Sequence, residues 1–378
     1  MKRIAIGVGG RFHSESLFHA LTAAGHEVRL FSSYPKSRIR VPRHSLTTFP
    51  LAEIGYQLGR LAHIEDPADR FKMGYLGRRI LEQVQALAPD VFIGWSSFSL
   101  ETLRARPATT HILIRDSTHI SFQNDILAEE YRRRSIPFPK REFCSRRELE
   151  EYEKADQIWV LSDFARSTFL ERGLNERKIS VLPLGVDLRL FVPRPHRKTT
   201  LPIRVVSFGT LSVRKGLHYL LEAMERLPSH SISLTLIGHL EPEFRKILTR
   251  SNRVDWIPAL KQSDLAQKLP EFDVAVVPTL EDGFGQSVVQ AMASGLVPVV
   301  TKHCGASSII EQGVNGFVVE PGNSDAIASC LRELISSPEK IAGMAESARA
   351  AAQHFTWERY ANRSLALLEE HVNPCVRH

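Results

Sequence analysis

The sequence predicts an α/β protein made of two Rossmann-like, doubly wound domains that face each other across a cleft. Along its 378 residues, short apolar segments typical of buried strands alternate with helical segments. This alternation predicts parallel sheets with helices on both faces. It stops at a basic, proline-rich segment, residues 192–202, and then restarts. The length also fits two domains of about 150 residues each. We therefore place one domain at 1–191 and a second at 192–355.

The first half opens with a strand–helix–strand unit. A strand at 4–8 is followed by glycines, a helix at about 14–24, and a second strand at 28–31. Such an opening is typical of a parallel sheet. The remaining strand segments of this half are expected at 91–94, 111–114, 158–161 and 179–182.

The second half repeats the pattern and ends in helices. A strand at 205–208 precedes a helix at 215–227, and two helices close the chain, at 338–352 and 356–378. No further strand follows that would place the last helix in the second sheet, so we expect this helix to cross back onto the first domain. The other strands of this half are expected at 233–237, 254–256, 274–277 and 297–300.

Composition excludes disordered and fibrous proteins, because 43% of the residues are hydrophobic and 24% are charged. No apolar run approaches the roughly 20 residues of a membrane-spanning helix. The start, Met1-Lys2-Arg3, leads into a strand instead of a secretory signal. We therefore expect a cytoplasmic protein. The four cysteines form no paired motif, which predicts free thiols.

The net charge of +7 lies mostly in the first half. Residues 1–190 hold 29 Lys and Arg against 23 Asp and Glu, whereas the remainder holds 20 against 19. Such a surplus can draw a protein to an anionic membrane, here the inner face, or it can belong to a solvated helix. No nucleic-acid recognition motif accompanies it, so no nucleic acid is expected. The surplus peaks at Arg132-Arg133-Arg134, Lys140-Arg141 and Arg146-Arg147.

The segment 278–295 carries the strongest signal of a binding site. A buried strand ends there in an acidic, glycine-rich turn, and a helix begins near Gln286. A helix N-terminus offers free N–H groups and partial positive charge, which suit a phosphate. Glycines in the turn permit close approach of a ligand, Glu281 or Asp282 can accept sugar hydroxyls, and Gln290 can bond a ribose. An ordinary strand–helix turn fits the same residues.

With these residues in view, the chain resembles the retaining nucleotide-sugar glycosyltransferases of the GT-B fold, in the large family-four group. The resemblance lies in Asp282-Gly283-Phe284-Gly285 and in the run 291–295 with Pro298-Val299 behind it. The chain departs from the family pattern at two positions. Asp282 stands where a glutamate is expected, next to Glu281, and Gln290 replaces the second glutamate.

The resemblance implies roles for residues in both halves. It places Arg214 and Lys215 on the donor diphosphate, with the helix start at Gln286-Ser287. His119 is the candidate for facing the donor sugar, and His13 is a weaker one. The catalytic set is then His119, Glu281, Asp282, Arg214 and Lys215, and the donor-binding set is Gly9, Gly10, Gly283, Phe284, Gly285, Gln286, Ser287 and Gln290.

The expected activity is transfer of a sugar from a nucleoside-diphosphate sugar to a glycan, lipid-linked or small-molecule acceptor, with retention of the anomeric configuration. The resemblance implies no cofactor and no metal, and no metal-ligand cluster appears in the sequence. Two other functions remain open. A non-catalytic sugar-nucleotide-binding partner subunit would bind donor without turnover, and a sugar-nucleotide epimerase would isomerise it.

Overall fold

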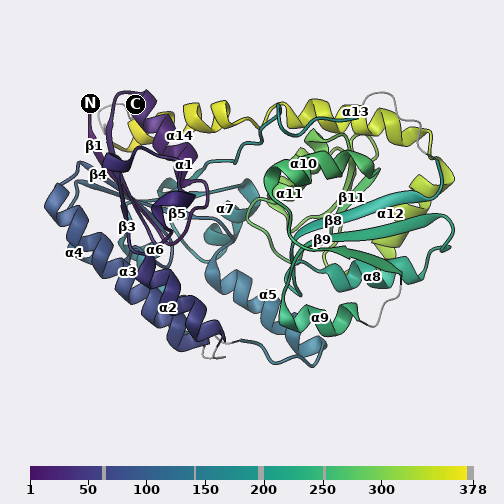
Figure 1. The fold of residues 1–378 in the computed structure, drawn as a ribbon, viewed down its shortest axis with the longest axis horizontal. Helices are drawn as coiled ribbons and strands as arrows, with labels where there is room; N and C mark the ends of the chain where they lie inside the picture. The colour runs from purple at the N-terminus through teal and green to yellow at the C-terminus, as the bar shows by residue number, and fades with distance from the viewer. Residues whose placement is uncertain (62–64, 140–141, 195–199, 250–252, 373–378) are drawn as a thin grey trace.

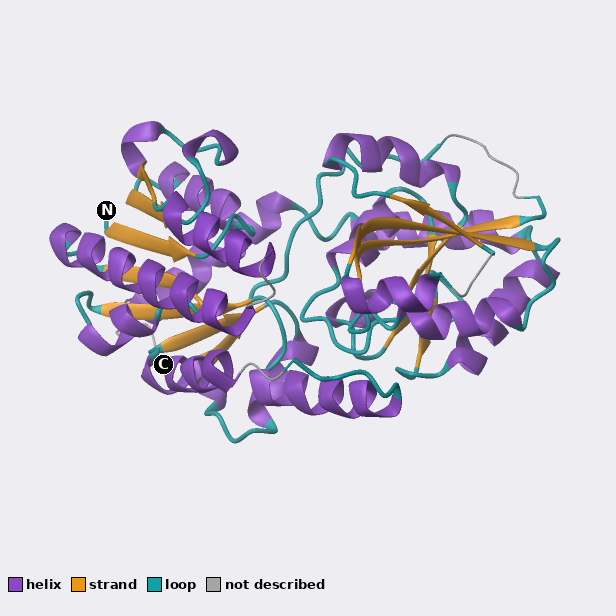
Figure 2. Ribbon diagram, turned by 60° about the horizontal axis from the view of Figure 1, so that its bottom comes forward, coloured by secondary structure: helices purple, strands orange, loops and turns teal. Residues whose placement is uncertain are grey.

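The computed structural model describes residues 1–378 except 62–64, 140–141, 195–199, 250–252 and 373–378 (Figure 1). Two separate parallel sheets confirm the predicted α/β architecture. The first has the strand order β3-β2-β1-β4-β5-β6-β7 and the second β10-β9-β8-β11-β12-β13. Figure 2 shows helices on both faces of each sheet. The strands are β1 (Arg3–Val8), β2 (Glu27–Ser32), β3 (Leu46–Thr48), β4 (Val91–Trp95), β5 (Thr110–Arg115), β6 (Gln157–Val160), β7 (Ile179–Val181), β8 (Ile203–Leu211), β9 (Ile232–Leu240), β10 (Val254–Ile257), β11 (Val274–Val277), β12 (Val297–Thr301) and β13 (Phe317–Val319).

All eleven strands expected from the apolar segments are present, whereas β3 and β13 were not predicted. Both are three-residue strands at sheet edges, too short to give a periodic signal. The helices are α1 (Ser14–Ala23), α2 (Pro50–Leu61), α3 (Glu65–Leu87), α4 (Leu100–Ala105), α5 (Ile120–Arg133), α6 (Glu142–Lys154), α7 (Asp163–Leu170), α8 (Leu217–Glu225), α9 (Pro242–Leu248), α10 (Gln262–Lys268), α11 (Gln286–Ala293), α12 (Ser324–Ser336), α13 (Lys340–Ala352) and α14 (Trp357–Val372).

The C-terminal helix α14 packs on the first domain, as expected. Tyr360, Leu367 and Leu368 are buried in one apolar cluster with residues of β1 and α1. The chain therefore crosses between the domains twice, and the crossings touch. The Val186 N–H donates to the Phe355 carbonyl at 2.8 Å, and a Cβ on Gly185 would lie 2.4 Å from the Trp357 nitrogen.

Helix α5 belongs to the first domain but reaches the second (Figure 1). Ile126 and Leu127 pack against the second domain's apolar core. At the far end of the helix, buried Glu130 accepts hydrogen bonds from the Tyr219 hydroxyl at 2.7 Å and from the His218 ring at 2.8 Å. These contacts fix the first domain against the second along one side of the cleft.

Some expectations lie outside the described residues, namely Lys140-Arg141, Cys375 and the last six residues of the predicted C-terminal helix. Cys144, Cys304 and Cys330 are buried free thiols. Within the described parts of the chain, no helix is long and apolar enough to cross a membrane.

Candidate functional site

The two domains meet at the carboxyl ends of β5 and β11. The turn after β11, residues 281–285, packs directly on the loop after β5, residues 116–118. A Cβ on Gly283 would lie 2.6 Å from the Asp116 carbonyl oxygen, so only glycine permits this approach. The Ser162 hydroxyl donates to the Gly283 carbonyl at 2.6 Å. The sequence predicts that Gly283 permits close approach of a ligand. In the structure it permits close approach of the first domain's backbone.

Glu281 is fully buried and links the two domains, whereas the sequence predicts that Glu281 or Asp282 accepts sugar hydroxyls. From the first domain it accepts the Thr118 N–H at 3.0 Å, the Thr118 hydroxyl at 2.8 Å, the Gln123 amide at 2.7 Å and the Ser117 hydroxyl. From its own domain it accepts Arg214 at 2.9 Å. A carboxylate has about four lone pairs, so little acceptor capacity remains for a sugar.

The ionisation of Glu281 follows from these partners. Burial raises the pKa of Glu281, but the Arg214 charge and the hydrogen bonds from Ser117 and Thr118 outweigh burial and hold the pKa well below its ordinary range. Glu281 is therefore a carboxylate at every physiological pH.

Lys215 and Asp282 form a second ion pair beside the first. Asp282 also accepts the backbone N–H of Gly285 at 3.0 Å and of Phe284 at 3.3 Å, so it shapes the turn. Both predicted acids are thus bonded to the two predicted cations. Arg214 has five N–H donors and Lys215 has three, so each cation keeps donors for a further anionic group.

Helix α11 begins at this turn, as predicted. Gly285 precedes it in the left-handed conformation, at φ 86°, and the first N–H groups of the helix lack acceptors within it. The Gln286 amide donates to the Gly185 carbonyl at 2.8 Å. Ser287, the second residue of the helix, is half-buried. Phe284 is buried in the second domain's core. Gln290 is buried and donates to Gln262 at 2.9 Å, a contact that sequence reasoning did not foresee.

The glycines after β1 owe their identity to packing. A Cβ on Gly9 would lie 2.1 Å from the Phe98 ring, and one on Gly10 would lie 3.3 Å from the Phe12 ring. The Gly10 carbonyl accepts the Ser32 hydroxyl at 2.7 Å. This loop lies at the carboxyl end of its strand, on the side of the sheet that faces the second domain.

His119 does not face the cleft, so its predicted place is wrong. It is 2% exposed and caps α5, its ring accepting the Ser121 N–H at 3.2 Å. The ring packs against Tyr152 and Phe169 in the core. Burial and the charge of Arg172 lower the pKa of His119 to about 4, so the imidazole is neutral. A histidine that follows a strand can cap the next helix as readily as it can face a ligand.

Asp116 is the residue that sequence reasoning missed in this loop. One carboxylate oxygen lies 2.9 Å from Nε2 of His13, and the other accepts the Trp95 indole N–H at 3.0 Å. Nδ1 of His13 lies 2.7 Å from the Tyr360 hydroxyl. The four residues come from the ends of β1, β4 and β5 and from α14. The sequence signal for Asp116 is its position directly after a strand, in Arg115-Asp116-Ser117.

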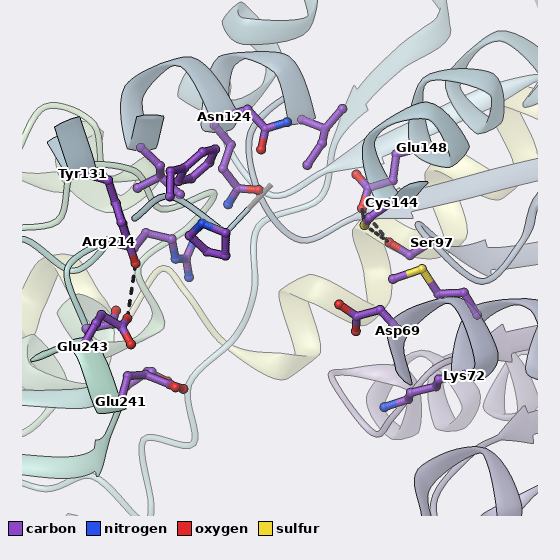
Figure 3. Close-up of a pocket in the computed structure, with 18 of the residues that line it drawn as sticks. Asp69, Lys72, Ser97, Asn124, Tyr131, Cys144, Glu148, Arg214, Glu241 and Glu243 are labelled. Carbon is purple, nitrogen blue, oxygen red and sulfur yellow. Dashed lines mark hydrogen bonds between the residues drawn. The ribbon is translucent and has the colours of Figure 1, made fainter. Parts of the chain in front are cut away.

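A cavity of about 740 Å³ opens between the domains (Figure 3). Asp69, Lys72 and Glu148 line it from the first domain, opposite Glu241 and Glu243 of the second. The Tyr131 hydroxyl crosses the gap and donates to Glu243 at 3.3 Å.

Three basic side chains line this cavity, and each forms an ion pair with a carboxylate. Lys72 pairs with Glu53 at 2.7 Å, Arg115 lies 3.2 Å from Glu148, and Arg214 pairs with Glu281 at 2.9 Å. Among the described residues that line the cavity, every basic side chain therefore has a carboxylate partner.

The basic cluster of α5 makes ion pairs with acids, although Arg132 and Arg133 share one carboxylate and both stay exposed. Arg132 and Arg133 both bond Glu129, and Arg134 bonds Glu130 and, across the domains, Glu222 at 2.7 Å. Among the described residues, no group of three or more potential ligands could hold a metal ion.

Two parallel-sheet domains joined by a double crossing, with an acidic glycine-rich turn between them, define the GT-B class. Comparison with known proteins agrees: the model of Glycosyl transferases group 1 matches residues 191–351, and that of Glycosyltransferase Family 4 matches residues 9–190. The chain belongs to the GT-B glycosyltransferases.

Individual relatives are distant. The chain is 26% identical over 359 residues to a GDP-mannose-dependent alpha-(1-6)-phosphatidylinositol dimannoside mannosyltransferase of Mycobacterium tuberculosis, covering 92% of this chain and 88% of that one. It is 30% identical over 223 residues to an MMP alpha-(1->4)-mannosyltransferase of Mycolicibacterium hassiacum, covering 56% of this chain and about half, 51%, of the relative.

Solved structures share the fold. Sucrose-phosphate synthase from Thermosynechococcus elongatus superposes with a TM-score of 0.74 at 18% identity, over 98% of this chain and 99% of that one. Anabaena HepE in complex with UDP-glucose superposes with a TM-score of 0.71 at 20% identity, over 98% and 100% of the two chains.

Proposed function

We propose that this protein transfers a sugar from a nucleoside-diphosphate sugar to an acceptor hydroxyl, with retention of the anomeric configuration. One arrangement carries the proposal: Arg214, Lys215 and the N-terminus of α11 lie together where the two domains meet. Cationic side chains and helix N-termini are the groups that bind a diphosphate. The names of the relatives support the same class, since one depends on GDP-mannose and one structural neighbour holds UDP-glucose.

In this proposal the second domain stabilises the leaving group. When the bond between the anomeric carbon and the phosphate oxygen breaks, the electron pair stays on the diphosphate. Arg214, Lys215 and the helix N–H groups stabilise that charge because they are already in place. The acceptor oxygen attacks from the same face, and the leaving phosphate oxygen takes its proton. Glu281 and Asp282 hold the two cations in position.

The cavity between the domains is proposed as the acceptor site. Its three basic side chains are bonded to carboxylates, and Asp69, Glu148, Glu241 and Glu243 also line it. These four carboxylates can accept hydrogen bonds from hydroxyl groups. A hydroxyl-rich glycan therefore suits this cavity as the acceptor.

The test is incubation of the protein with UDP-glucose, GDP-mannose and related sugar nucleotides, with simple glycosides and oligosaccharides as acceptors. Proton NMR of the product would show the anomeric configuration. A product with the configuration of the donor supports the proposal, and an inverted product contradicts retention. Binding of a donor without any transfer would favour the non-catalytic partner subunit, and isomerisation of the donor would favour an epimerase.

A further inference from the structure

The loop network around Asp116 has no role in the reaction proposed so far. It lies at the carboxyl ends of β1, β4 and β5, three neighbouring strands in the centre of the first sheet. The same loop supplies Ser117 and Thr118 to Glu281 of the second domain. In parallel α/β sheets, ligands bind at the carboxyl ends of central strands.

The Asp116 carboxylate keeps acceptor capacity that Glu281 does not. His13 and Trp95 each donate one N–H to it, and each occupies one lone pair on a different carboxylate oxygen. Its side chain is 22% exposed, against 0% for Glu281. Two lone pairs therefore remain on a carboxylate that is half-open to the junction of the domains.

An aromatic surface adjoins this carboxylate. The Phe12 ring stacks on Trp95, with centroids 6.5 Å apart, and is 57% exposed. Phe12 has φ 41°, a left-handed conformation that costs a residue with a side chain about 1–2 kcal/mol. Such strain is concentrated at functional sites. An exposed ring beside a carboxylate suits a sugar, which has an apolar face and hydroxyl edges.

The contacts behind Asp116 fix which proton His13 presents. A carboxylate can only accept, so Nε2 of His13 carries a proton and donates it to Asp116 at 2.9 Å. In the neutral ring Nδ1 is then the acceptor for the Tyr360 hydroxyl, 2.7 Å away. Tyr360 stands on α14, which gives the crossing helix a role at the junction.

We propose that the Asp116 carboxylate binds a hydroxyl of the transferred sugar, with His13 and Tyr360 as positioning residues that hold it. The inference rests on the proposed function, because it assumes a sugar-nucleotide donor. It assigns the sugar to the first domain and leaves the diphosphate to Arg214, Lys215 and α11. Removing the Asp116 charge should therefore weaken binding of the sugar nucleotide and leave binding of the bare diphosphate unchanged.

The test is calorimetric titration of the full chain with UDP, UDP-glucose, GDP and GDP-mannose. Asp116→Asn should raise the Kd of the sugar nucleotide that binds the wild type by about tenfold, the size of one charged hydrogen bond, without changing the Kd of its diphosphate. Asp90→Asn is the matched control, since Asp90 accepts the Arg3 N–H at the amino ends of β1 and β4, at the opposite end of the strands, and should alter neither Kd.

A second pair of variants separates positioning from folding. His13→Gln keeps an N–H donor for Asp116 and should retain sugar-nucleotide affinity, whereas His13→Leu should lose it to the same extent as Asp116→Asn. Nitrogen NMR of His13 should show the Nε2–H tautomer in the wild type and a changed tautomer balance in Tyr360→Phe.

Two results would overturn the inference while leaving the proposed function intact: an unchanged Kd for the sugar nucleotide in Asp116→Asn, or equal weakening of sugar nucleotide and diphosphate. If the wild type bound neither these four probes nor the ADP, dTDP and CDP diphosphates and their sugar nucleotides, the proposed donor class itself would be refuted, and the sugar site with it.

Discussion

Glu281 and Thr118 stand on different domains, and the Glu281 carboxylate accepts both the backbone N–H and the hydroxyl of Thr118, at 3.0 and 2.8 Å. Glu281, one of the two acids expected to accept sugar hydroxyls, thus links the two domains. This link presents Arg214 to the cavity, because the guanidinium bonds the other oxygen of the same carboxylate. The position of the proposed diphosphate site is consequently tied to the closure of the two domains.

Glu281→Gln should destabilise the protein by about 3 kcal/mol or more, since it leaves the Arg214 charge without its buried partner. Calorimetric unfolding at neutral pH would measure the loss. Glu320→Gln is the control, because Glu320 makes an exposed pair with Lys302 in the same domain and should have almost no effect. An equally small effect of both variants would show that Glu281 does not hold the domains together.

Gly283→Ala should separate the domains. The added methyl group would lie 2.6 Å from backbone atoms of Asp116 and Ser117, which cannot move aside as a flexible side chain can. Small-angle scattering should show a larger radius of gyration. Gly343→Ala is the matched control: nothing lies within 4 Å of its Cβ, it sits in α13, and the substitution should stabilise the protein by about 0.5–1 kcal/mol. An unchanged radius in Gly283→Ala would contradict the close approach.

His119 should make stability fall on acidification. Its pKa is about 4 in the folded protein against 6.5 for the free side chain, so the unfolded chain binds more protons between those values. Stability is thus intact above pH 6.5 and decreases towards pH 4, by up to about 3 kcal/mol. His119→Asn keeps a capping oxygen but does not titrate. Urea unfolding at pH 7.5 and 5 should show a smaller pH-dependent loss for this variant, and an equal loss would exclude His119 as the cause.

Much of the fold could be predicted from the sequence, because buried parallel strands are continuous apolar runs that stand out against helices. The site was only partly predictable. The sequence predicts a turn that ends near Gln286 with the start of a helix, since its glycines and acids are local signals, and the structure has that turn and helix start. Which partner each acid takes depends on a loop 165 residues earlier in the chain, at 116–118. The sequence predicts that His119 faces the donor sugar, whereas this side chain caps α5. A sequence alone does not distinguish a capping side chain from one that faces the cleft.

Lys215→Ala should weaken binding of the nucleoside diphosphate about tenfold, because one charged contact is lost while Arg214 and the N-terminus of α11 remain. Isothermal titration with UDP and GDP would measure the change. Lys268→Ala is the control, since Lys268, the last residue of α10, makes a similar ion pair with Glu271 in the same domain. Equal affinities for the wild type and Lys215→Ala would remove Lys215 from the diphosphate site.

The central claim is that donor turnover takes place where Arg214, Lys215 and the start of α11 meet. The most direct measurement is the release of nucleoside diphosphate from a panel of sugar nucleotides by the wild type and by Lys215→Ala, with Lys268→Ala as the control. The account predicts release from one class of donor, retained in Lys268→Ala and strongly reduced in Lys215→Ala. Release that is equal in all three proteins would contradict it.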